Sequence, residues 1–437
     1  MDITATTTQA IFGTSGAARG EGAAGREPAA RPFDALTLEQ QKAHFADVAT
    51  RALALWGWPA DATLKLLNIT ENATYKVSTP DRDPMVMRVH RLDYASRSSI
   101  ECELAWIEEL SRVTDLNLAR PLPGLDGKLV QRVATPAMRE VRNVVCFSYA
   151  TGAAPVDSTD DTGALGGVLA ALGVLPNALT FPLVRLASSA YDRLGHEGQG
   201  PSEMSEQDAW LYRSMGRAAG LMRRAAMDWV PKHEEEVASR IAWDWDATFG
   251  EGWNNYYGKH YWDADSTLTH RDVLAVNAAR DLIRKRLAAF GTSPERYGLV
   301  HSDLRMGNLL VDGQKMTVLD FDDCGMGWYL FDIAGMVGFM EHRGDLKAVV
   351  DKILEGYEEA YPLSEDERRE IPTFILMRRI GLLQALQYHI GNAEPGSNEA
   401  TQITPDLIAF YARGTAVLAR RYLRDMSGAP LAAPAEG

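Results

Sequence analysis

Four polar side chains lie near the ends of two short apolar segments that form a predicted β-hairpin. Asp303 and Asn308 precede the first segment, Asp320 and Asp322 follow the second, and an Asp312-Gly313 turn is expected between the two. Because hairpin strands run antiparallel, Asn308 and Asp320 should meet at the same end of the hairpin. Oxygen ligands without His or Cys suit a hard cation, so this pattern favours Mg²⁺ over zinc.

Asp303 adds a second chemical function to this end of the hairpin. It lies five residues before Asn308, near the expected metal ion, and its carboxylate is free to accept a hydrogen bond from a hydroxyl group. Phosphoryl transfer needs a metal ion that bridges phosphates and a carboxylate that aligns the attacking oxygen. The spacing of these residues therefore predicts phosphoryl transfer to a hydroxyl.

The segment from His301 to Asp320 resembles the His-x-Asp-x-x-x-x-Asn loop and the following Asp of the aminoglycoside phosphotransferase and choline kinase family, which is related to protein kinases. The downstream sequence Trp328-Tyr-Leu-Phe-Asp332-Ile-Ala334 strengthens the resemblance, which covers about residues 40–425 apart from much of 153–204. The family implies an α+β, bilobal, protein kinase-like fold, with a small antiparallel-sheet N-lobe and a large, mainly helical C-lobe. It also implies ATP and Mg²⁺ as cofactors.

The resemblance implies a role for each polar residue of this segment. Asp303 would orient the acceptor hydroxyl, and Asn308 and Asp320 would hold Mg²⁺ against the nucleotide phosphates. Asp322 is either an additional metal ligand or a loop carboxylate. Arg305 either contacts the transferred phosphate or is a surface residue.

The same resemblance assigns two supporting residues and an ion pair. His301 would support the loop through hydrogen bonds, and Asp332 would anchor it through backbone amides. Arg88 occupies the strand position where protein kinases carry a phosphate-binding lysine, and its guanidinium suits phosphate oxygens. Its partner on the following helix would be Glu103 or, as the alternative, Glu101.

The expected nucleotide site lacks a glycine-rich loop. The sequence has Thr-Glu-Asn-Ala-Thr at 70–74 in its place, so phosphate contacts are expected from backbone N–H groups and from Asn72 and Thr74. The adenine is expected against the backbone of the segment 146–149, which contains Phe147 and Tyr149.

The surrounding sequence predicts the elements that position these residues. Short β-rich runs and one helix come first, and i, i+3, i+4 apolar spacing then predicts a series of helices. The expected strands are 64–69, 74–78, 85–90, 128–133 and 141–149, and the expected helices are 37–58, 98–110, 208–227, 277–290, 346–361, 371–390 and 405–424. This pattern predicts an N-lobe over 34–149 and a C-lobe over 150–426.

Three segments are expected to lie outside the two folded lobes. Residues 1–33 are rich in Ala, Gly and Thr and predict a disordered tail, because they offer little apolar surface to bury. Residues 153–204 are interpreted as an insertion in the C-lobe, and residues 427–437 as a second loose tail.

Composition limits the class of protein. The 437 residues contain 45 Lys and Arg against 59 Asp and Glu, giving a net charge of −14 that opposes nucleic-acid binding. There is no uninterrupted apolar run of about 18 residues, as a membrane helix requires, and no secretory signal pattern is recognised. Three scattered cysteines predict no disulfide framework, so a cytoplasmic location is expected.

Several alternatives stay open at this level. The aromatic run from Trp243 to Trp262 either lines a pocket for an ammonium group or packs in the core, and Arg378 and Arg379 face either the cleft or solvent. The predicted partners are a nucleotide and a small, amine-bearing acceptor such as homoserine, choline, ethanolamine, hydroxylysine or an aminoglycoside. The rival functions are a catalytically inactive nucleotide-binding module and a protein kinase.

Overall fold

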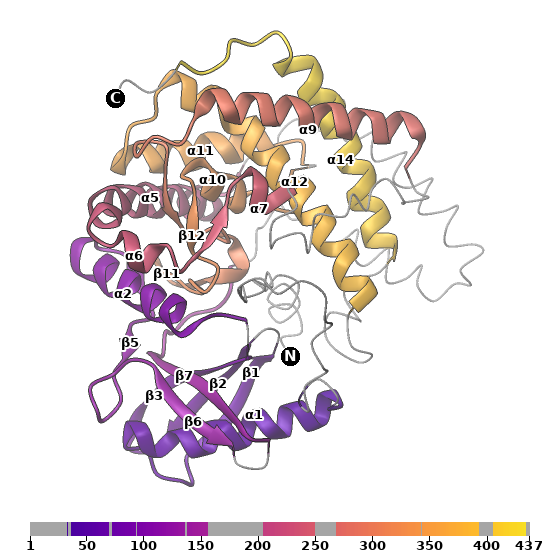
Figure 1. Ribbon diagram of the computed structural model, residues 1–437. Coiled ribbons are helices and arrows are strands. Elements are labelled where there is room, and N and C mark those ends of the chain that lie inside the picture. The colour runs from indigo at the N-terminus through magenta and orange to yellow at the C-terminus, as the bar shows by residue number, and fades with distance from the viewer. Residues whose placement is uncertain are drawn as a thin grey trace.

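A computed structural model describes residues 33, 36–69, 72–92, 94–135, 138–155, 204–249, 268–341, 343–392 and 405–433. Most of the predicted insertion and of the N-terminal tail therefore lies outside the described residues. A small sheet-containing part lies on one side of the molecule and a larger group of helices on the other (Figure 1).

The smaller part is built on an antiparallel sheet with the order β1-β2-β3-β7-β5, and β6 also pairs with β7. Its strands are β1 (Thr63–Ile69), β2 (Asn72–Thr79), β3 (Arg82–His90), β5 (Pro121–Leu122), β6 (Gln131–Thr135) and β7 (Glu140–Ser148). Helix α1 (Leu38–Ala52) lies against this sheet (Figure 1). The helix begins with a capping box, in which Thr37 and Gln40 satisfy each other's backbone N–H groups.

Alternating residues of the sheet form a separate apolar core with α1. Ala73, Tyr75 and Val77 of β2 are buried on the same side, as the two-residue repeat of a strand requires. Phe33 is also buried, and its ring packs edge-on against Phe45 of α1 at 5.2 Å between centroids. Phe33, which was expected to end the disordered tail, is thus part of the packed structure.

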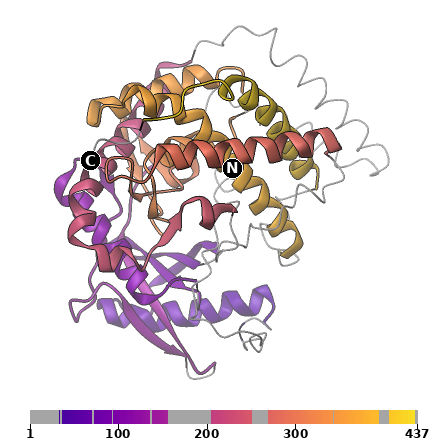
Figure 2. The same cartoon turned by 45° about the horizontal axis from the view of Figure 1, so that its top comes forward.

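The larger part consists mainly of helices (Figure 2). Helix α2 (Arg97–Val113) follows β3 and packs against α5 and α6. The helices that follow are α5 (Glu206–Trp229), α6 (Glu234–Val237), α7 (Trp245–Phe249), α9 (His270–Phe290), α10 (Leu330–Met336), α11 (Leu346–Ala360), α12 (Glu365–Asn392) and α14 (Pro405–Met426). Short 3-10 turns cover Leu53–Trp56, Val230–Lys232 and Met306–Asn308.

Helices α5 and α11 approach closely because each presents a glycine to the other's backbone. A Cβ atom added at Gly216 would lie 1.8 Å from the carbonyl oxygen of Ile353, and one added at Gly356 would lie 1.8 Å from that of Arg213. Both positions therefore require glycine for packing, whereas an interior helical glycine is otherwise unfavourable by about 1 kcal/mol relative to alanine.

We expect Gly216→Ala to lower the free energy of unfolding by about 3 kcal/mol, because overpacking outweighs the gain in helix propensity. Urea unfolding followed by circular dichroism measures the change. Gly381→Ala in α12 is the matched control, since its new Cβ would meet only Thr248 Cγ2 at an ordinary 3.5 Å. An equal loss in both variants would contradict the packing explanation.

The larger part also contains two small sheets, which pair short strands from its loops. One contains the hairpin of β10 (Leu309–Asp312) and β11 (Lys315–Val318), with β4 (Asn117–Leu118) pairing parallel to β11. A second contact, an isolated bridge, joins Ala153 to Val311. The other sheet has the order β8-β12-β9, from β8 (Ile241–Trp243), β12 (Gly325–Trp328) and β9 (Tyr297–Val300).

The hairpin turn is displaced by one residue from the predicted Asp312-Gly313. Asp312 pairs with Lys315, so the turn consists of Gly313 and Gln314. Gly313 has a φ of +62°, a conformation that glycine adopts without a steric penalty. The prediction of the turn position was therefore wrong, because it placed the glycine second in the turn when it is first.

The prediction of a loose tail from 427 is corrected for residues 427–433. Arg286 Nη2 donates to the Pro430 carbonyl oxygen at 2.8 Å, and Arg296 Nη1 donates to that of Ala433 at 2.9 Å. Asp366 accepts a hydrogen bond from the Ala433 backbone N–H at 2.8 Å. The small and polar residues of this segment suggested that it is not attached to the folded part. Its backbone carbonyls instead accept hydrogen bonds from arginines of the helical part.

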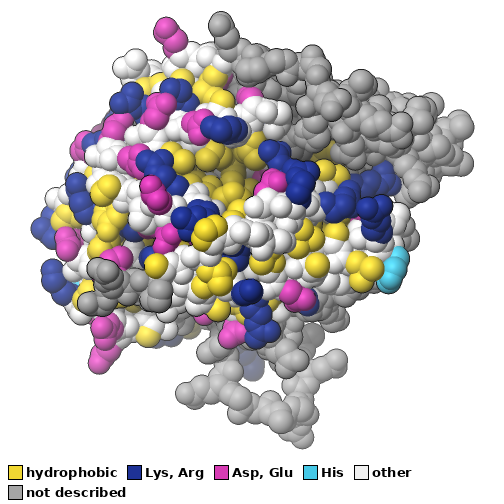
Figure 3. Space-filling model, turned by 90° about the horizontal axis from the view of Figure 1, so that it is seen from above, with side chains coloured by type: hydrophobic (Ala, Val, Ile, Leu, Met, Phe, Trp, Pro, Cys, Tyr) yellow, Lys and Arg dark blue, Asp and Glu magenta, His cyan; other side chains and the backbone are white. Residues whose placement is uncertain are grey.

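The small antiparallel sheet with its helix and the larger, mainly helical part agree with the predicted α+β architecture of two unequal lobes. Within the described part of the chain, no helix is long and apolar enough to cross a membrane. The face seen in Figure 3 carries basic and acidic side chains spread among apolar ones.

Candidate active site

The β10–β11 hairpin brings the ends of its two strands together. Leu309 pairs with Val318, and the Leu319 backbone N–H donates to the Asn308 carbonyl oxygen at 2.9 Å. The residue that follows, Asp320, has a φ of +62°. A positive φ is uncommon outside glycine, so the chain turns sharply where Asp320 leaves the hairpin.

Asp303 is buried at the centre of a network of charged and amide groups. Its Oδ2 accepts hydrogen bonds from Arg305 Nε at 3.0 Å and from Asn308 Nδ2 at 2.7 Å, and its Oδ1 accepts one from Arg378 Nη2 at 2.7 Å. Burial alone would raise the pKa of Asp303, but the charges of Arg305 and Arg378 hold that pKa below its usual value. Asp303 is therefore an ionised hydrogen-bond acceptor. Arg305 is buried, so the alternative of a surface residue is wrong.

The loop that carries Asp303 is fixed from two sides. Asp332 of α10 accepts hydrogen bonds from the backbone N–H groups of His301 at 3.1 Å and Ser302 at 2.7 Å. His301 Nε2 lies 2.9 Å from the Leu319 carbonyl oxygen, which connects the loop to the hairpin. Ser302 has a φ of +68°, and these bonds hold its backbone in that unfavourable conformation. These hydrogen bonds agree with the roles predicted for His301 and Asp332, which are to hold the loop in place.

Asp320 and Asp322 lie together beside a buried arginine. Arg88 Nη1 is 3.7 Å from Asp320 Oδ1 and 4.0 Å from Asp322 Oδ2. The Asp320 side chain is 47% exposed and that of Asp322 is 14% exposed, so Asp320 is the more accessible of the two. Burial, and next the negative charge of Asp320, raises the pKa of Asp322 to about 8. Two crowded carboxylates favour a bound cation.

The donor set fits a hard cation. Asn308 uses its amide nitrogen for Asp303, and within the described residues its amide oxygen has no hydrogen-bond partner. This oxygen and the carboxylates of Asp320 and Asp322 are the ligand types that Mg²⁺ prefers. Among the described residues no group of three or more His, Cys, Asp or Glu side chains forms a metal site by itself. A metal site here would therefore combine the amide oxygen of Asn308 with the two carboxylates.

Arg88 on β3 pairs with Glu103 on α2, and both side chains are buried. The structure selects Glu103 over the alternative Glu101, which is exposed and pairs with Arg97 at 2.8 Å. Thr74 is the cross-strand neighbour of Arg88. The Arg88 guanidinium also lies over the ring of Phe147, 5.1 Å from its centroid, so Phe147 supports Arg88 from the sheet.

We expect Glu103→Ala to lower the free energy of unfolding by about 3 kcal/mol, because removing one partner of a buried ion pair costs about 3–5 kcal/mol. In this variant Asp320 and Asp322 still lie next to Arg88, so we expect a loss of stability at the lower end of that range. Glu101→Ala is the matched control on the same helix, with an expected loss below about 1 kcal/mol for an exposed pair. Urea titrations of both variants would contradict the assignment if the two losses were equal.

The side chain of Asn72, at the start of β2, contacts the acidic residues of the candidate site. Its Nδ2 donates to Asp322 Oδ2 at 3.0 Å, connecting the start of β2 to the segment after β11. Its predicted phosphate contact would therefore have to compete with this bond. Residues 70 and 71 of the same expected loop lie outside the described residues.

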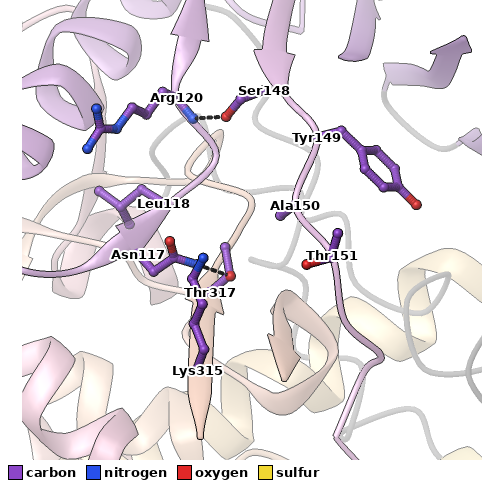
Figure 4. Close-up of a pocket in the computed structure, with 9 residues that line it drawn as sticks. All are labelled: Asn117, Leu118, Arg120, Ser148, Tyr149, Ala150, Thr151, Lys315 and Thr317. Carbon is purple, nitrogen blue, oxygen red and sulfur yellow. Dashed lines mark hydrogen bonds between the residues drawn. The ribbon is translucent and has the colours of Figure 1, made fainter. Parts of the chain in front are cut away.

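The segment after β7 borders a pocket of about 300 Å³. Figure 4 shows Ser148, Ala150 and Thr151 on one side of this pocket, and the ring of Tyr149 directed away from it. Lys76 of β2 lies over the Tyr149 ring at 4.1 Å. Tyr149 is thus one of the residues that line the pocket, but its ring is turned towards Lys76 of β2.

Two arginines of the site were not assigned from the sequence. Arg378 of α12 donates to Asp303 Oδ1 and to the Ser302 carbonyl oxygen, whereas the sequence left it between cleft and solvent. Arg240, between α6 and β8, donates to the backbone of the segment after Asp320. Arg379 is buried against Glu341, with Nη1 2.7 Å from Oε2. The helical spacing of apolar residues around Arg378 could have indicated that this arginine lies on the buried face of its helix. No local sequence pattern marks Arg240 as buried.

The aromatic run that was expected to form either a pocket or core lies only partly within the described residues. Trp243 is buried and stacks on Phe331 at 5.9 Å between ring centroids, which corresponds to the core alternative. Residues 250–267 lie outside the described residues.

Comparisons with known proteins agree with this geometry. Residues 63–370 match the model of the phosphotransferase enzyme family. The amicoumacin kinase of Bacillus subtilis (strain 168) is 22% identical over 363 residues, 78% of this chain and 86% of the relative. The microcompartment-associated aminopropanol kinase has 27% identity and a TM-score of 0.63, covering 89% of this chain and 100% of the other.

A second solved structure, an amicoumacin kinase in complex with AMP-PNP, Ca²⁺ and Ami, has 17% identity and a TM-score of 0.58, covering 87% of this chain and 96% of the other. The spectinomycin phosphotransferase APH(9)-Ia has 13% identity and a TM-score of 0.51, covering 84% and 95%; these two similarities show the fold. The prediction of a phosphotransferase that acts on hydroxyl groups is confirmed. The family match spans well over half of the sequence, and the chain therefore belongs to the phosphotransferase enzyme family.

Proposed function

We propose that the chain is an ATP- and Mg²⁺-dependent kinase that transfers the γ-phosphoryl group to a hydroxyl of a small, amine-bearing acceptor. The observation that carries this proposal is the hydrogen bonding of Asp303. Both hydrogen-bonding positions of Oδ2 are used by Arg305 and Asn308, whereas Oδ1 accepts a single hydrogen bond from the described residues, that of Arg378. Oδ1 therefore retains one position for the acceptor hydroxyl.

In this proposal the acceptor hydroxyl donates its hydrogen bond to Asp303 Oδ1. The acceptor oxygen forms a bond to the γ-phosphorus as the bond from that phosphorus to the ADP oxygen breaks, and the hydroxyl proton passes to Asp303 and then to solvent. Because phosphoryl transfer proceeds through a loose transition state, the main task of Asp303 is to align the oxygen. Its lowered pKa suits an acceptor of hydrogen bonds more than a strong base.

Asn308, Asp320 and Asp322 would hold the divalent cation, which neutralises phosphate charge when bound. Arg88, fixed by Glu103, would place a permanent positive charge near the phosphates. Support for nucleotide and divalent metal comes from the similar amicoumacin kinase, which holds AMP-PNP and Ca²⁺. The choice of Mg²⁺ over other cations rests on the oxygen donors.

The amine-bearing acceptor rests on the relatives. The aminopropanol kinase acts, by its name, on a compound with an amine and a hydroxyl. The similarity to it covers 89% of the present chain. The acceptor class is therefore an amino alcohol, with homoserine, choline, ethanolamine, hydroxylysine and aminoglycosides as members to be compared.

Acceptor-dependent ADP release, measured with Mg·ATP and a panel of amino alcohols beside neutral and acidic alcohols, tests this function. We expect turnover with one or more amine-bearing compounds. Turnover with neutral or acidic alcohols alone would overturn the acceptor class. Nucleotide binding without any acceptor-dependent turnover would favour the inactive binding module, and phosphorylation of proteins alone would favour the protein kinase.

A further inference from the structure

Arg240 is a buried arginine whose hydrogen bonds all go to two segments of the candidate site. It lies directly before β8 and is only 8% exposed. Nε donates to the Cys324 carbonyl oxygen at 2.7 Å, and Nη2 donates to the carbonyl oxygens of Phe321, at 3.4 Å, and Asp322. Its guanidinium thus binds the backbone of the segment that begins at Asp320.

The carbonyl of Asp323 is bound by a neighbour of Arg240. Trp243 Nε1 donates to the Asp323 carbonyl oxygen at 2.9 Å. The four successive carbonyls of residues 321–324 are therefore all held by side chains from 240–243. β8 then continues as a parallel partner of β12, with Ile241 opposite Gly325. A Cβ at Gly325 would lie 2.3 Å from the Ile241 carbonyl oxygen, so the two backbones are in close contact.

The other end of the guanidinium reaches helix α2. Arg240 Nη1 donates to both the carbonyl oxygen and Oγ of Ser99, each at 2.9 Å. Ser99 lies one helical turn before Glu103, the residue that fixes Arg88. Arg240 therefore connects the helix that positions Arg88 with the segment that carries Asp320 and Asp322.

This connection has an energetic reason. Asp320 has a φ of +62°, a conformation that costs about 1–3 kcal/mol and persists only where surrounding contacts enforce it. Planar donors in a fixed geometry suit several carbonyls at once, which a lysine ammonium cannot match. We infer that Arg240 is a positioning residue that holds the Asp320–Cys324 segment in the geometry required for binding a divalent cation and nucleotide.

This inference deepens the proposed function and rests on it. The test uses the full chain, Mg²⁺ and AMP-PNP, with calorimetry to find the Mg²⁺ concentration that gives half-maximal nucleotide binding. For Arg240→Gln we expect that concentration to rise about 10- to 100-fold, the range seen when partners that orient metal ligands are removed. Arg240→Lys should behave similarly, because it keeps the charge but loses the planar geometry.

Arg286→Gln is the matched control. Arg286 is also buried and donates to the backbone carbonyls of Met426, Ala429 and Pro430. Unlike Arg240 it also pairs with a carboxylate, that of Glu370, so its loss of stability should be the larger. It lies in α9, and none of its hydrogen bonds within the described residues reaches the candidate site. It should lose thermal stability while its Mg²⁺ requirement stays that of the wild type. Trp243→Phe removes one hydrogen bond and keeps an aromatic ring, so it provides a milder variant if Arg240→Gln does not fold. We expect it to raise the Mg²⁺ requirement by a smaller factor.

The outcomes separate the two claims. If the Arg240 and Trp243 variants lose stability as the Arg286 variant does, and bind AMP-PNP with the wild-type Mg²⁺ requirement, the positioning role is overturned and the proposed function stands. If the wild-type chain itself shows no Mg²⁺-dependent binding of AMP-PNP, the proposed function fails, and the inference about Arg240 fails with it.

Discussion

Asp303→Asn is expected to lower turnover by about 1,000-fold while Mg·ATP still binds, because positioned groups of this kind contribute about 10²- to 10⁴-fold. The wild-type carboxylate accepts hydrogen bonds at Oδ2 from Arg305 and Asn308 and at Oδ1 from Arg378. In asparagine an NH₂ group replaces one of these two oxygens. That NH₂ group would then face an N–H donor of Arg305, Asn308 or Arg378 where the wild type has an acceptor. The acceptor hydroxyl loses either its hydrogen-bond partner or its orientation.

Steady-state kinetics with the best acceptor, together with calorimetry of AMP-PNP binding, separates turnover from nucleotide affinity. Asp312→Asn is a suitable control, because Asp312 lies in the same hairpin but is exposed and accepts a hydrogen bond from Thr151 Oγ1 at 3.0 Å. Its turnover should equal that of the wild type. Near-normal turnover of Asp303→Asn would remove Asp303 from the proposed mechanism.

Asp320→Ala is expected to weaken Mg²⁺-dependent nucleotide binding by at least about 100-fold, since changes outside the first shell of ligands already cost about 10- to 100-fold. Asp320 is the more exposed of the two carboxylates next to Arg88. When the Asp320 charge is removed, Arg88 is still available for its proposed contact with the phosphates, so weak binding that does not depend on metal should persist.

Titration of AMP-PNP at several Mg²⁺ concentrations measures this change. Asp312→Asn is again the control, because Asp312 is exposed at the turn end of the same hairpin, pairs with Lys315 and is not among the proposed ligands. We expect its Mg²⁺ requirement to be unchanged. Unaltered titrations for Asp320→Ala would show that Asp320 is not a ligand.

The sequence predicts the parts of this site that are encoded locally. The spacing of Asp303, Asn308 and Asp320 around two apolar segments correctly indicates the hairpin, since strand pairing over a two-residue turn is a short-range property. The long helices of the C-terminal half were also predictable, because their apolar spacing repeats over several turns. The predicted starts of two of them are nearly two helical turns late: α9 begins at His270 and not at 277, and α12 begins at Glu365 and not at 371.

Contacts between residues distant in sequence could not be predicted in this way. Arg378 contacts Asp303 across 75 positions, and Arg240 contacts Asp322 across 82. Neither arginine belongs to a motif, and a buried arginine has the same local pattern whether it binds a carboxylate or backbone carbonyls. β4, with only two residues, has no periodicity that would indicate its pairing with β11.

Besides the connection from β3 to α2, two stretches of backbone join the sheet to the larger part, and each of these two is fixed at both ends. β4 pairs with β11 shortly before Arg120, and β5 pairs with β7 directly after it. Ser148 ends β7, and Ala153 is bridged to Val311. Arg120 and Ser148 are also hydrogen-bonded to each other, through the Ser148 N–H at 2.8 Å.

Residues 119–120 and 149–152 are therefore short links between points that are fixed on either side, and the Arg120–Ser148 hydrogen bonds hold the two links next to each other. We expect any rotation of the sheet relative to the helices to change the torsion angles of both links together, along with those of the connection from β3 to α2.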